Sequence, residues 1–350
     1  MADRGSYKSS GVDIEAGDHA VELIAKHAQS TNRPEVLSSI GGFAGAFAAR
    51  FKNYDDPVLL SATDGVGTKL AIAQTLDRHD TVGIDLVAMV VDDLVCHGAE
   101  PLFLLDYIAC GTVVPDRIER IVAGIADGCR TAGCALLGGE TAEHPGMMEP
   151  DAYDLAAFAV GVTERTAMWG PDKVQEGDAI IGIASSGLHA NGYSLVRKLI
   201  LEHDLDLTEP RNDLDGATLG DVLLEPTLIY APALLSLASD DGFEIHAAAH
   251  VTGGGIVGNV PRVLPSGLEA VIDPGAWPRA PIFAFLQRTG TVGEDDMWKT
   301  FNLGLGMTTL LSEGRAEAAI KGLGERGFSA YRIGSVRRGD GGVVREVRST

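Results

Sequence analysis

Basic residues and aromatic residues are both scarce in this sequence. Its 350 residues include 28 Lys and Arg against 49 Asp and Glu, which leaves a formal net charge of −21. Nucleic acids and anionic membranes attract proteins through clusters of Lys and Arg, so we expect neither as a partner. Aromatic residues make up only 6% of the chain, which argues against a prion-like composition.

Cysteines and long apolar runs are also few. The four cysteines fall between positions 96 and 134, and none forms a C-x-x-C pair. This spacing excludes a secreted disulfide framework and a zinc site, and it predicts reduced, buried thiols. No apolar run approaches 18 residues, and residues 1–17 lack the apolar core of a signal peptide. We therefore expect a soluble, cytoplasmic protein.

Glycine is abundant, and the length suggests two domains. The 44 glycines are about one residue in eight, against an average near 7%. Strand-like and helix-like runs alternate along the chain, but several strands follow one another without a helix long enough for a crossover. We therefore predict an α+β fold of two layered domains, 1–168 and 169–350, with a flexible leader at 1–20. The domain boundary falls in the polar segment 166–177.

The individual runs predict particular elements. The predicted strands are 58–63, 102–109, 134–137, 155–162, 179–185, 245–251, 268–272 and 306–311. The predicted helices are 20–29, 68–76, 85–97, 116–131, 191–202, 226–239, 282–287 and 315–326.

The sharpest local motif is Thr63-Asp64-Gly65-Val66-Gly67-Thr68-Lys69, where a strand gives way to a helix. Glycines there let backbone N–H groups approach an anion, Asp64 can hold a metal, and Lys69 can reach a phosphate. The alternative is a plain glycine turn with Asp64 as a helix cap. No Walker A sequence occurs, so this is not a P-loop.

The predicted helix 85–97 carries three acids among apolar residues. Asp85 and Asp92 are seven residues apart and lie within about 20° on the helical wheel, whereas Asp93 lies about 80° from Asp85. Buried acids are costly unless they are paired or bound to a cation, and Mg²⁺ is commonly held by one or two carboxylates plus phosphates. The alternative is a first-turn acid at Asp85, with the other two facing water.

Two further glycine loops combine hydroxyl, imidazole and acid groups. The segment 138–146 follows a strand-like run, and its Glu140 is either a metal or substrate ligand or part of a solvated turn. The segment 185–193 precedes a helix and offers hydroxyls and free amides to an anion, with His189 as an acid, a base or a donor. Its alternative is simple helix capping by Ser186 or Asn191.

The segment 250–258 matches a dinucleotide-binding pattern. Gly253, Gly255 and Gly258 have G-x-G-x-x-G spacing after a strand, and Asp273 lies 20 residues further on. Pro261 interrupts the helix that this pattern needs, which favours a phosphate-binding glycine loop. An NAD-dependent dehydrogenase remains an alternative.

Taken in order, five motifs resemble the phosphoribosylformylglycinamidine cyclo-ligase family of purine biosynthesis, the aminoimidazole ribonucleotide synthetases. The resemblance runs from about Tyr7 to about Ser335. Its motifs are Asp64-Gly65-Val66-Gly67-Thr68-Lys69, Gly83-Ile84-Asp85-Leu86-Val87-Ala88-Met89, Gly138-Gly139-Glu140-Thr141-Ala142-Glu143, Ser185-Ser186-Gly187-x-His189-x-Asn191-Gly192-Tyr193-Ser194-Leu195 and His250-x-Thr252-Gly253-Gly254-Gly255.

The resemblance implies an enzyme that uses ATP and Mg²⁺ to close the imidazole ring of formylglycinamidine ribonucleotide, releasing ADP and phosphate. It implies homodimers whose N-terminal sheets pair into a barrel, a helix-covered C-terminal sheet, and a leader with Lys8 that closes over the site. The implied catalytic residues are His189, Lys69 and Asp93. The implied metal ligands are Asp64, Asp85, Asp93 and Glu140. The implied cofactor-binding residues are Asp64, Gly65, Gly67, Thr68, Lys69, Gly138, Gly139, Glu140 and Thr141. The implied substrate-binding residues are Ser186, Gly187, His189, Asn191, His250, Thr252, Gly253, Gly254 and Gly255.

One departure from the family concerns the metal. The family commonly has Asn-Asp where this chain has Asp92-Asp93, so the resemblance favours Asp93 whereas the helical wheel favours Asp92 beside Asp85. Both acids stay open as the ligand, and we name Asp93 among the metal ligands. The other functional alternative is a non-catalytic ATP-binding protein of the same architecture.

Overall fold

A computed structural model describes residues 13–38, 40, 44–240 and 242–347. The N-terminal half forms a four-stranded sheet in the order β1-β4-β2-β3. β4 is antiparallel to β1 and β2, whereas β2 and β3 are parallel and are joined by a helix. The elements are α1 (Ile14–Gln29), β1 (Pro57–Gly65), α2 (Leu70–Leu76), α3 (Val82–Val95), β2 (Glu100–Cys110), α4 (Pro115–Ala132), β3 (Ala135–Glu143) and β4 (Tyr153–Glu164).

The C-terminal half forms a six-stranded mixed sheet in the order β10-β7-β9-β5-β8-β6. Its central strands β5 and β8 are almost fully buried, which accounts for their continuous apolar runs. Its strands are β5 (Ala179–Ala184), β6 (Ile245–His250), β7 (Leu268–Ile272), β8 (Leu305–Leu311), β9 (Ala330–Arg338) and β10 (Val343–Arg345). Its helices are α5 (Tyr193–Glu202), α6 (Leu219–Leu224), α7 (Ala231–Asp240), α8 (Gly255–Asn259), α9 (Pro281–Gly290), α10 (Glu294–Thr300) and α11 (Ala316–Glu325).

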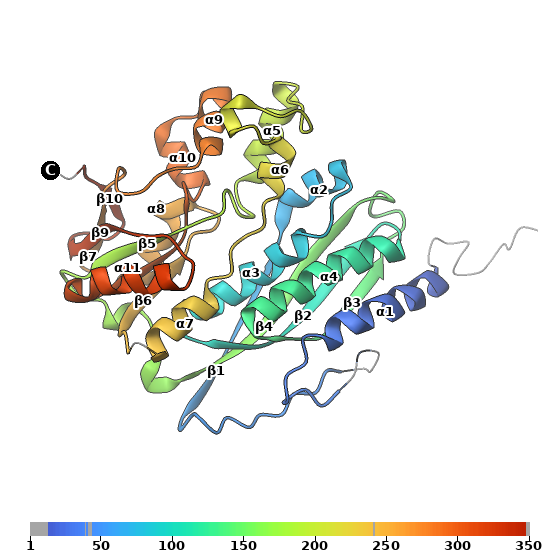
Figure 1. Ribbon diagram of the computed structural model, residues 1–350, viewed down its shortest axis with the longest axis horizontal. Helices are drawn as coiled ribbons and strands as arrows, with labels where there is room; N and C mark the ends of the chain where they lie inside the picture. The colour runs from blue at the N-terminus through green and yellow to red at the C-terminus, as the bar shows by residue number, and fades with distance from the viewer. Residues whose placement is uncertain (1–12, 39, 41–43, 241, 348–350) are drawn as a thin grey trace, which may run out of the picture.

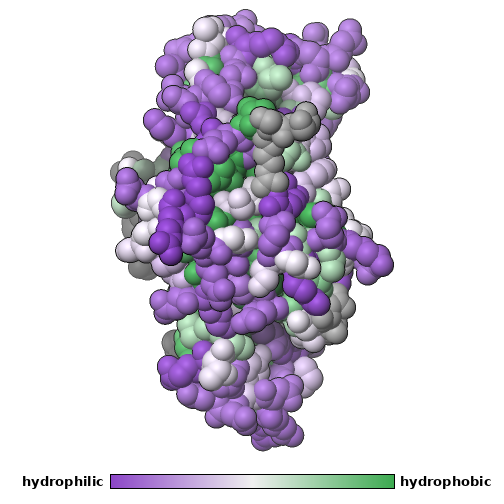
Figure 2. Space-filling model, turned by 90° about the vertical axis from the view of Figure 1, so that its left-hand side faces the viewer, coloured by the Kyte–Doolittle hydropathy of each residue, from purple (hydrophilic) through white to green (hydrophobic). Residues whose placement is uncertain are grey.

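Among the described residues, no helix covers one face of the four-stranded sheet, here called the uncovered face (Figure 1). Helices α1, α3 and α4 lie along the other face (Figure 1). The side chains of β4 alternate between buried and exposed over most of its length, as expected for a sheet with one solvated face. Large apolar side chains nevertheless stand on the uncovered face: Leu59 is 58% exposed, Phe158 43% and Tyr107 42%. By contrast, hydrophilic side chains predominate on the face shown in Figure 2.

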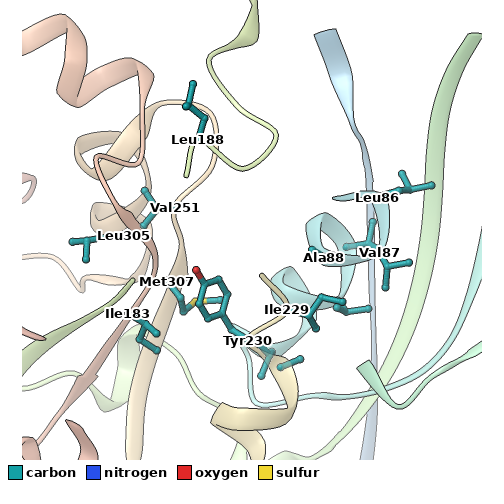
Figure 3. Packing of buried hydrophobic residues seen from close by; sticks show 14 of the residues in the cluster. Leu86, Val87, Ala88, Ile183, Leu188, Ile229, Tyr230, Val251, Leu305 and Met307 are labelled. Carbon is teal, nitrogen blue, oxygen red and sulfur yellow. The ribbon is translucent and has the colours of Figure 1, made fainter. Parts of the chain in front are cut away.

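A continuous hydrophobic core joins the two halves. Helix α3 is buried almost all round, so its apolar positions pack on both sides. Figure 3 shows Ile229 beside α3, while the neighbouring Tyr230 turns its ring toward Met307 and Ile183 of the second sheet. The Tyr230 hydroxyl donates to the carbonyl of Ala184 at 2.8 Å. The segment that leads into α7 therefore fixes the two sheets relative to each other.

Several expected elements differ from the structure. Residues 138–143 continue strand β3 rather than forming a loop, because they pair with 105–110 of β2. Helix α7 begins at Ala231 rather than at 226, and α1 begins at Ile14, inside the predicted flexible leader. Asp13 caps α1 by accepting from the amide of Ala16. Lys8 and the rest of the leader up to residue 12 lie outside the described residues.

The cysteines are free thiols, as predicted. Three of them are buried and Cys96 is partly buried. Burial raises the pKa of Cys110 to about 11, which keeps that thiol protonated and unreactive at neutral pH. Among the described residues, no helix combines the length and apolarity needed to cross a bilayer.

Candidate active site

Two carboxylates and an imidazole meet where β1, α3 and β6 converge. Asp64 lies near the end of β1, Asp93 near the end of α3 and His250 at the end of β6. The Nδ1 of His250 lies 3.1 Å from an oxygen of Asp93. The side chain of Asp93 is 40% exposed, whereas that of His250 is only 3% exposed. The structure thus brings three of the predicted residues together.

The charges of these three residues influence one another. Burial raises the pKa of Asp64, and the neighbouring charge of Asp93 raises it further, despite a hydrogen bond from the amide of Gly65. Burial tends to lower the pKa of His250, but the bond to Asp93 and the charges of Asp92 and Asp64 outweigh it, so the net shift is upward. The Nε2 atom of His250 is buried and has no hydrogen-bond partner among the described residues. A bound cation would offset the repulsion between the carboxylates.

Two hollows flank these carboxylates. One of about 400 Å³ is bounded by 60–63 of β1, by Asp93 and by 248–250 of β6, with Arg262 at its side. β1 and β6 are edge strands of their sheets. The other, of about 710 Å³, is bounded by 64–68 and 190–195. The site therefore lies between the two sheets, where both halves of the chain contribute.

Lys69 does not reach toward this site. It is fully buried, and its ammonium group is 2.8 Å from one oxygen of Asp85 and 2.9 Å from the other. It also donates to the carbonyls of His189, at 3.0 Å, and Glu225, at 2.7 Å. An ammonium group has three N–H donors, and these acceptors use them all. In this structure Lys69 is therefore not placed to bind phosphate at the site, contrary to expectation.

Asp85 is likewise engaged in structure rather than at an open site. It is fully buried and accepts from the amide and the hydroxyl of Thr227, at 2.8 and 2.6 Å, in addition to Lys69. A metal ion beside it would meet the ammonium group at contact distance. We therefore correct the prediction of Asp85 as a metal ligand: it ties α3 to the segment before α7.

The contacts of Asp92 show which of the two adjacent acids, Asp92 or Asp93, is accessible to a ligand. It is fully buried, and one of its oxygens accepts from the amides of Tyr230 and Ala231, each at 2.9 Å. It thus caps the first turn of α7, which explains why that helix begins later than predicted. Burial raises the pKa of Asp92 to about 7. Asp93 is the acid of this pair that remains accessible.

The loop 185–193 is held tightly, with His189 inside it. His189 has a positive φ of 63° and is only 2% exposed. Its Nε2 atom lies 3.3 Å from the amide of Ser186, and its Nδ1 atom has no partner among the described residues. Burial lowers its pKa well below the usual value, so the ring is neutral. The ring is buried within its own loop, where it holds Ser186, and a role for His189 in substrate orientation or proton transfer stays a prediction.

Other residues of this loop and of the first motif face the larger hollow. Asn191, Gly65, Gly67 and Thr68 border it. The hydroxyl of Thr68 lies 3.2 Å from that of Ser194. Ser194 is not among the predicted site residues. The hydroxyl of Ser186 instead donates to the carbonyl of Pro226 at 2.6 Å, and the carbonyl of Gly187 accepts from Ser185 and Asn302.

The loop that follows β6 is shaped by its glycines. Gly254 and Gly255 have φ of 95° and 62°, and a Cβ on Gly255 would lie 2.1 Å from the carbonyl oxygen of Trp298. The side-chain amide of Asn259 donates to the carbonyls of Thr252, Gly253 and Gly255. These bonds engage the loop carbonyls, and the amide of Gly255 donates to the carbonyl of Thr252 at 3.0 Å, so the loop is held by its own backbone and by Asn259.

The dinucleotide alternative is wrong. Helix α8 after the glycines has only five residues, and β6 and β7 lie at separate places in the sheet, with β9, β5 and β8 between them. A dinucleotide fold needs two neighbouring parallel strands joined through a full helix.

The Gly138–Thr141 segment lies far from Asp64 within one chain. It belongs to β3, at the opposite edge of the sheet from β1. Residues in register across the four strands are Asp64, Ala157, Asp106 and Gly139. Three strand spacings amount to about 14 Å, so Glu140 cannot share a metal ion with Asp64 of its own chain. Across the described part of the chain, no three His, Cys, Asp or Glu side chains gather as a complete metal site.

Comparisons with known proteins identify the fold and the family. Residues 45–163 match the family described as AIR synthase related protein, N-terminal domain, and residues 175–346 match its C-terminal domain. The fold is shared with thiamine-monophosphate kinase from Stenotrophomonas maltophilia K279a (TM-score 0.67, 20% identity, 95% of this chain and 97% of that one). It is also shared with the hydrogenase maturation protein HypE in complex with ATP (TM-score 0.63, 20% identity, 91% and 86%). The fold and the site thus define an AIR synthase related protein.

Curated relatives narrow the assignment. The chain is 53% identical over 337 residues to phosphoribosylformylglycinamidine cyclo-ligase of Geobacillus kaustophilus (strain HTA426), covering 96% of each chain. It is 51% identical over 343 residues to the protein of that name from Anaeromyxobacter sp. (strain Fw109-5), covering 98% of each. The chain belongs to the phosphoribosylformylglycinamidine cyclo-ligase family.

Proposed function

We propose that this chain catalyses the ATP-dependent cyclisation of formylglycinamidine ribonucleotide to 5-aminoimidazole ribonucleotide. The observation that carries the proposal is the pairing of Asp64 with Asp93 beside His250, in a chain 53% identical to a cyclo-ligase along nearly its whole length. In this reaction the formyl oxygen takes the γ-phosphoryl group of ATP. An amidine nitrogen then attacks the same carbon, phosphate leaves with that oxygen, and ADP is the other product.

The residues at the junction fit Mg²⁺ and a polyphosphate. Asp64 and Asp93 supply oxygen ligands from two separate elements, and magnesium typically takes one or two carboxylates together with phosphate oxygens. Bound there, the ion neutralises charge on the phosphates. His250 donates to Asp93 and so fixes its orientation. Burial, together with the neighbouring charge of Asp93, raises the pKa of Asp64, and a bound cation would offset both effects.

The remaining roles fall to backbone groups and hydroxyls. The amides of Gly65 and Gly255 already donate to Asp64 and Thr252, and the other amides of the glycine loops at 65–67 and 253–255 are suited to bind phosphate oxygens. Thr68, Ser194 and Asn191 border the larger hollow and are suited to bind ribose or phosphate. These groups hold and orient the reactants, which such a reaction requires more than it requires a protein nucleophile.

A homodimer completes the site in this proposal. The uncovered face with Leu59, Tyr107 and Phe158 is the surface that two N-terminal sheets would bury by closing into a barrel. If the two-fold axis runs along that barrel, β3 of the second copy lies beside β1 of the first. Glu140 of one chain then approaches the Asp64 side of the other, which removes the separation of about 14 Å within a chain.

The two domains have different roles in this proposal. We assign residues 1–168 to nucleotide, metal and dimer contacts, and residues 169–350 to the loops that hold the substrate. The structured spans of the two sheets, 57–164 and 179–345, support this division.

Turnover distinguishes this function from a non-catalytic ATP-binding protein. Purified chain, ATP, Mg²⁺ and formylglycinamidine ribonucleotide are mixed, and ADP and aminoimidazole ribonucleotide are measured over time. The enzyme releases ADP only when the ribonucleotide is present, with one product molecule for each ADP. Binding of ATP without substrate-dependent ADP release would leave the non-catalytic function in its place.

A further inference from the structure

The end of helix α10 and the turn that leads into strand β8 form one supporting segment, residues 298–304. Residues 301–304 are buried, and Thr300 borders the larger hollow of the candidate site. Two glycine loops of the second half, 185–193 and 252–255, lie against this segment. None of the predicted site residues belongs to it.

The two loops approach the supporting segment through glycines. A Cβ atom on Gly192 would lie only 2.4 Å from the ring of Phe301. A Cβ atom on Gly255 would lie 2.1 Å from the carbonyl oxygen of Trp298. Atoms this close leave no room for a side chain, so both contacts require glycine. The supporting segment therefore determines how far apart the two loops lie.

Asn302 holds the first of these loops through its side-chain amide. It is 3% exposed, and its N–H donates to the carbonyl of Gly187 at 2.9 Å. Its own carbonyl oxygen accepts from the amide of Gly304 at 2.9 Å. The hydroxyl of Ser185 donates to the same Gly187 carbonyl at 2.8 Å, and the amide of Ser185 donates to the carbonyl of Gly304 at 2.9 Å. A side-chain amide has both a donor and an acceptor, so Asn302 can bond the loop and its own turn at once.

Leu303 has an unusual backbone conformation at the centre of this turn. Its φ is 52°, in the left-handed region that is unfavourable for a residue with a Cβ atom. It is fully buried, and its carbonyl accepts from the indole N–H of Trp277 at 2.8 Å. Leu303 lies between Asn302 and Gly304, so its conformation closes the turn in which their hydrogen bond forms. Backbone strain of this kind persists where the surrounding structure imposes it, and it is concentrated at functional sites.

We infer that Asn302 is a positioning residue, which holds loop 185–193 at a fixed place relative to loop 252–255 for the substrate. The inference rests on the proposed function, in which loops of the second half hold the ribonucleotide. Asn302 is buried and acts through the carbonyl of Gly187. Residues 190–195, at the far end of the first loop, border the larger hollow. A shift of the loop at Gly187 would therefore move the groups that face a ligand.

Loss of this support should affect the ribonucleotide more than ATP. Among the described residues, the hydrogen bonds of the Asn302 side chain all go to the second half of the chain, whereas the proposed nucleotide contacts belong to residues 1–168. A displacement of about 1 Å in a group that orients a reactant can lower turnover about a hundredfold. We therefore expect kcat/KM for the ribonucleotide to fall while ATP binding persists. A residue that only stabilises the fold would not separate the two.

The test replaces Asn302 by leucine, which has a similar shape and neither a donor nor an acceptor. In Asn302→Leu the kcat/KM for formylglycinamidine ribonucleotide should fall at least about tenfold. The Kd for ATP with Mg²⁺, measured by calorimetry on the full-length chain, should stay within about threefold of the wild-type value. Asn212→Leu changes an exposed asparagine of the same half and is the matched control, which should keep both values.

The outcomes separate this inference from the proposed function. A folded Asn302→Leu with wild-type kcat/KM overturns the inference, and turnover by the wild type then leaves the proposed function intact. A parallel loss of ribonucleotide turnover and ATP affinity also overturns it, because a general loss of structure would explain both. A wild-type chain that forms no aminoimidazole ribonucleotide would overturn both.

A second measurement applies if the variant fails to fold. Hydrogen exchange of the wild-type chain is then followed with and without the ribonucleotide. Slower exchange in both 185–193 and 298–304 supports the inference, because the loop and its support respond together. Any other pattern in these two segments overturns it.

Discussion

Replacing Lys69 by methionine tests whether this residue stabilises the fold through buried contacts or binds phosphate. The substitution keeps the length of the side chain and removes its charge. In the structure the ammonium group is fully buried and joins α3, through Asp85, to the loop that carries His189 and to the carbonyl of Glu225. Methionine would leave Asp85 with only Thr227 as its donor.

The magnitude follows from what remains buried. Removing one partner of a buried ion pair typically costs about 3–5 kcal/mol, because the other charge is left uncompensated. Two orphaned carbonyl oxygens add to this cost, at about 1 kcal/mol or more each. We therefore expect Lys69→Met to lower the free energy of unfolding by about 4 kcal/mol or more. The double variant Lys69→Met/Asp85→Asn removes both charges and should cost less than the sum of the two single variants.

The assay is urea denaturation followed by circular dichroism and tryptophan fluorescence, with the two single variants and the double variant forming a cycle. Lys198→Met, an exposed lysine on α5, is the matched control and should shift the midpoint little. The structural role of Lys69 is refuted if Lys69→Met unfolds at the wild-type urea midpoint and differs from the wild type only in a raised KM for ATP. That pattern would mean that Lys69 leaves its buried position to bind phosphate.

Three further predictions concern stability and assembly. Since the folded pKa of Asp106, about 7, lies above the unfolded value near 3.8, stability falls as pH rises through that window. Asp106→Asn should therefore raise the free energy of unfolding at pH 8, by up to about 4 kcal/mol, and show no gain at pH 3.5 in urea denaturation, and an equal effect at both pH values would contradict this. Phe158→Glu places like charges in the sheet face proposed for dimerisation and should yield monomers in light scattering, and a dimer of unchanged affinity would contradict that face. Gly192→Ala would place a Cβ at a φ of 85° and only 2.4 Å from the Phe301 ring. It should lower the free energy of unfolding by about 2 kcal/mol or more in thermal denaturation, and an unchanged midpoint would contradict this.

Local sequence patterns predict most elements of this fold. Helix 116–131 and strand 268–272 stand out because their apolar periods are complete, and the structure has helix Pro115–Ala132 and strand Leu268–Ile272 there. Strand β3 was predicted to end at 137 because Gly138 and Gly139 read as a loop. Pairing with β2 overrides that local signal, and the proximity of Asp106 accounts for Gly139.

The acids show where sequence reasoning fails for the site. The helical wheel correctly places Asp85 and Asp92 on one buried face, but it cannot tell whether a buried carboxylate meets a metal ion or a donor of the protein. Lys69 and Thr227 partner Asp85, and the amides of Tyr230 and Ala231 partner Asp92. The donors from the second half lie more than 130 residues away in the chain, so no local pattern reveals them.

The family resemblance favours Asp93 over Asp92 as the accessible acid, whereas the helical wheel favours Asp92. Asp93 points away from the buried face and meets His250, a contact across 157 positions. The motif of His189 is conspicuous in the sequence, but it does not reveal that the ring is packed inside its own loop. A motif identifies residues that matter without saying whether they touch the substrate.

Magnesium-dependent formation of aminoimidazole ribonucleotide by Asp93→Asn tests the central claim most directly. The claim is that Asp64 and Asp93 form the charged centre of the reaction. The variant should fold normally, since Asp93 is accessible, and should turn over at least about a hundredfold more slowly than the wild type. Asp116→Asn, an exposed acid at the start of α4, should keep wild-type turnover. Near-normal turnover by Asp93→Asn would contradict the account and place the metal ion elsewhere.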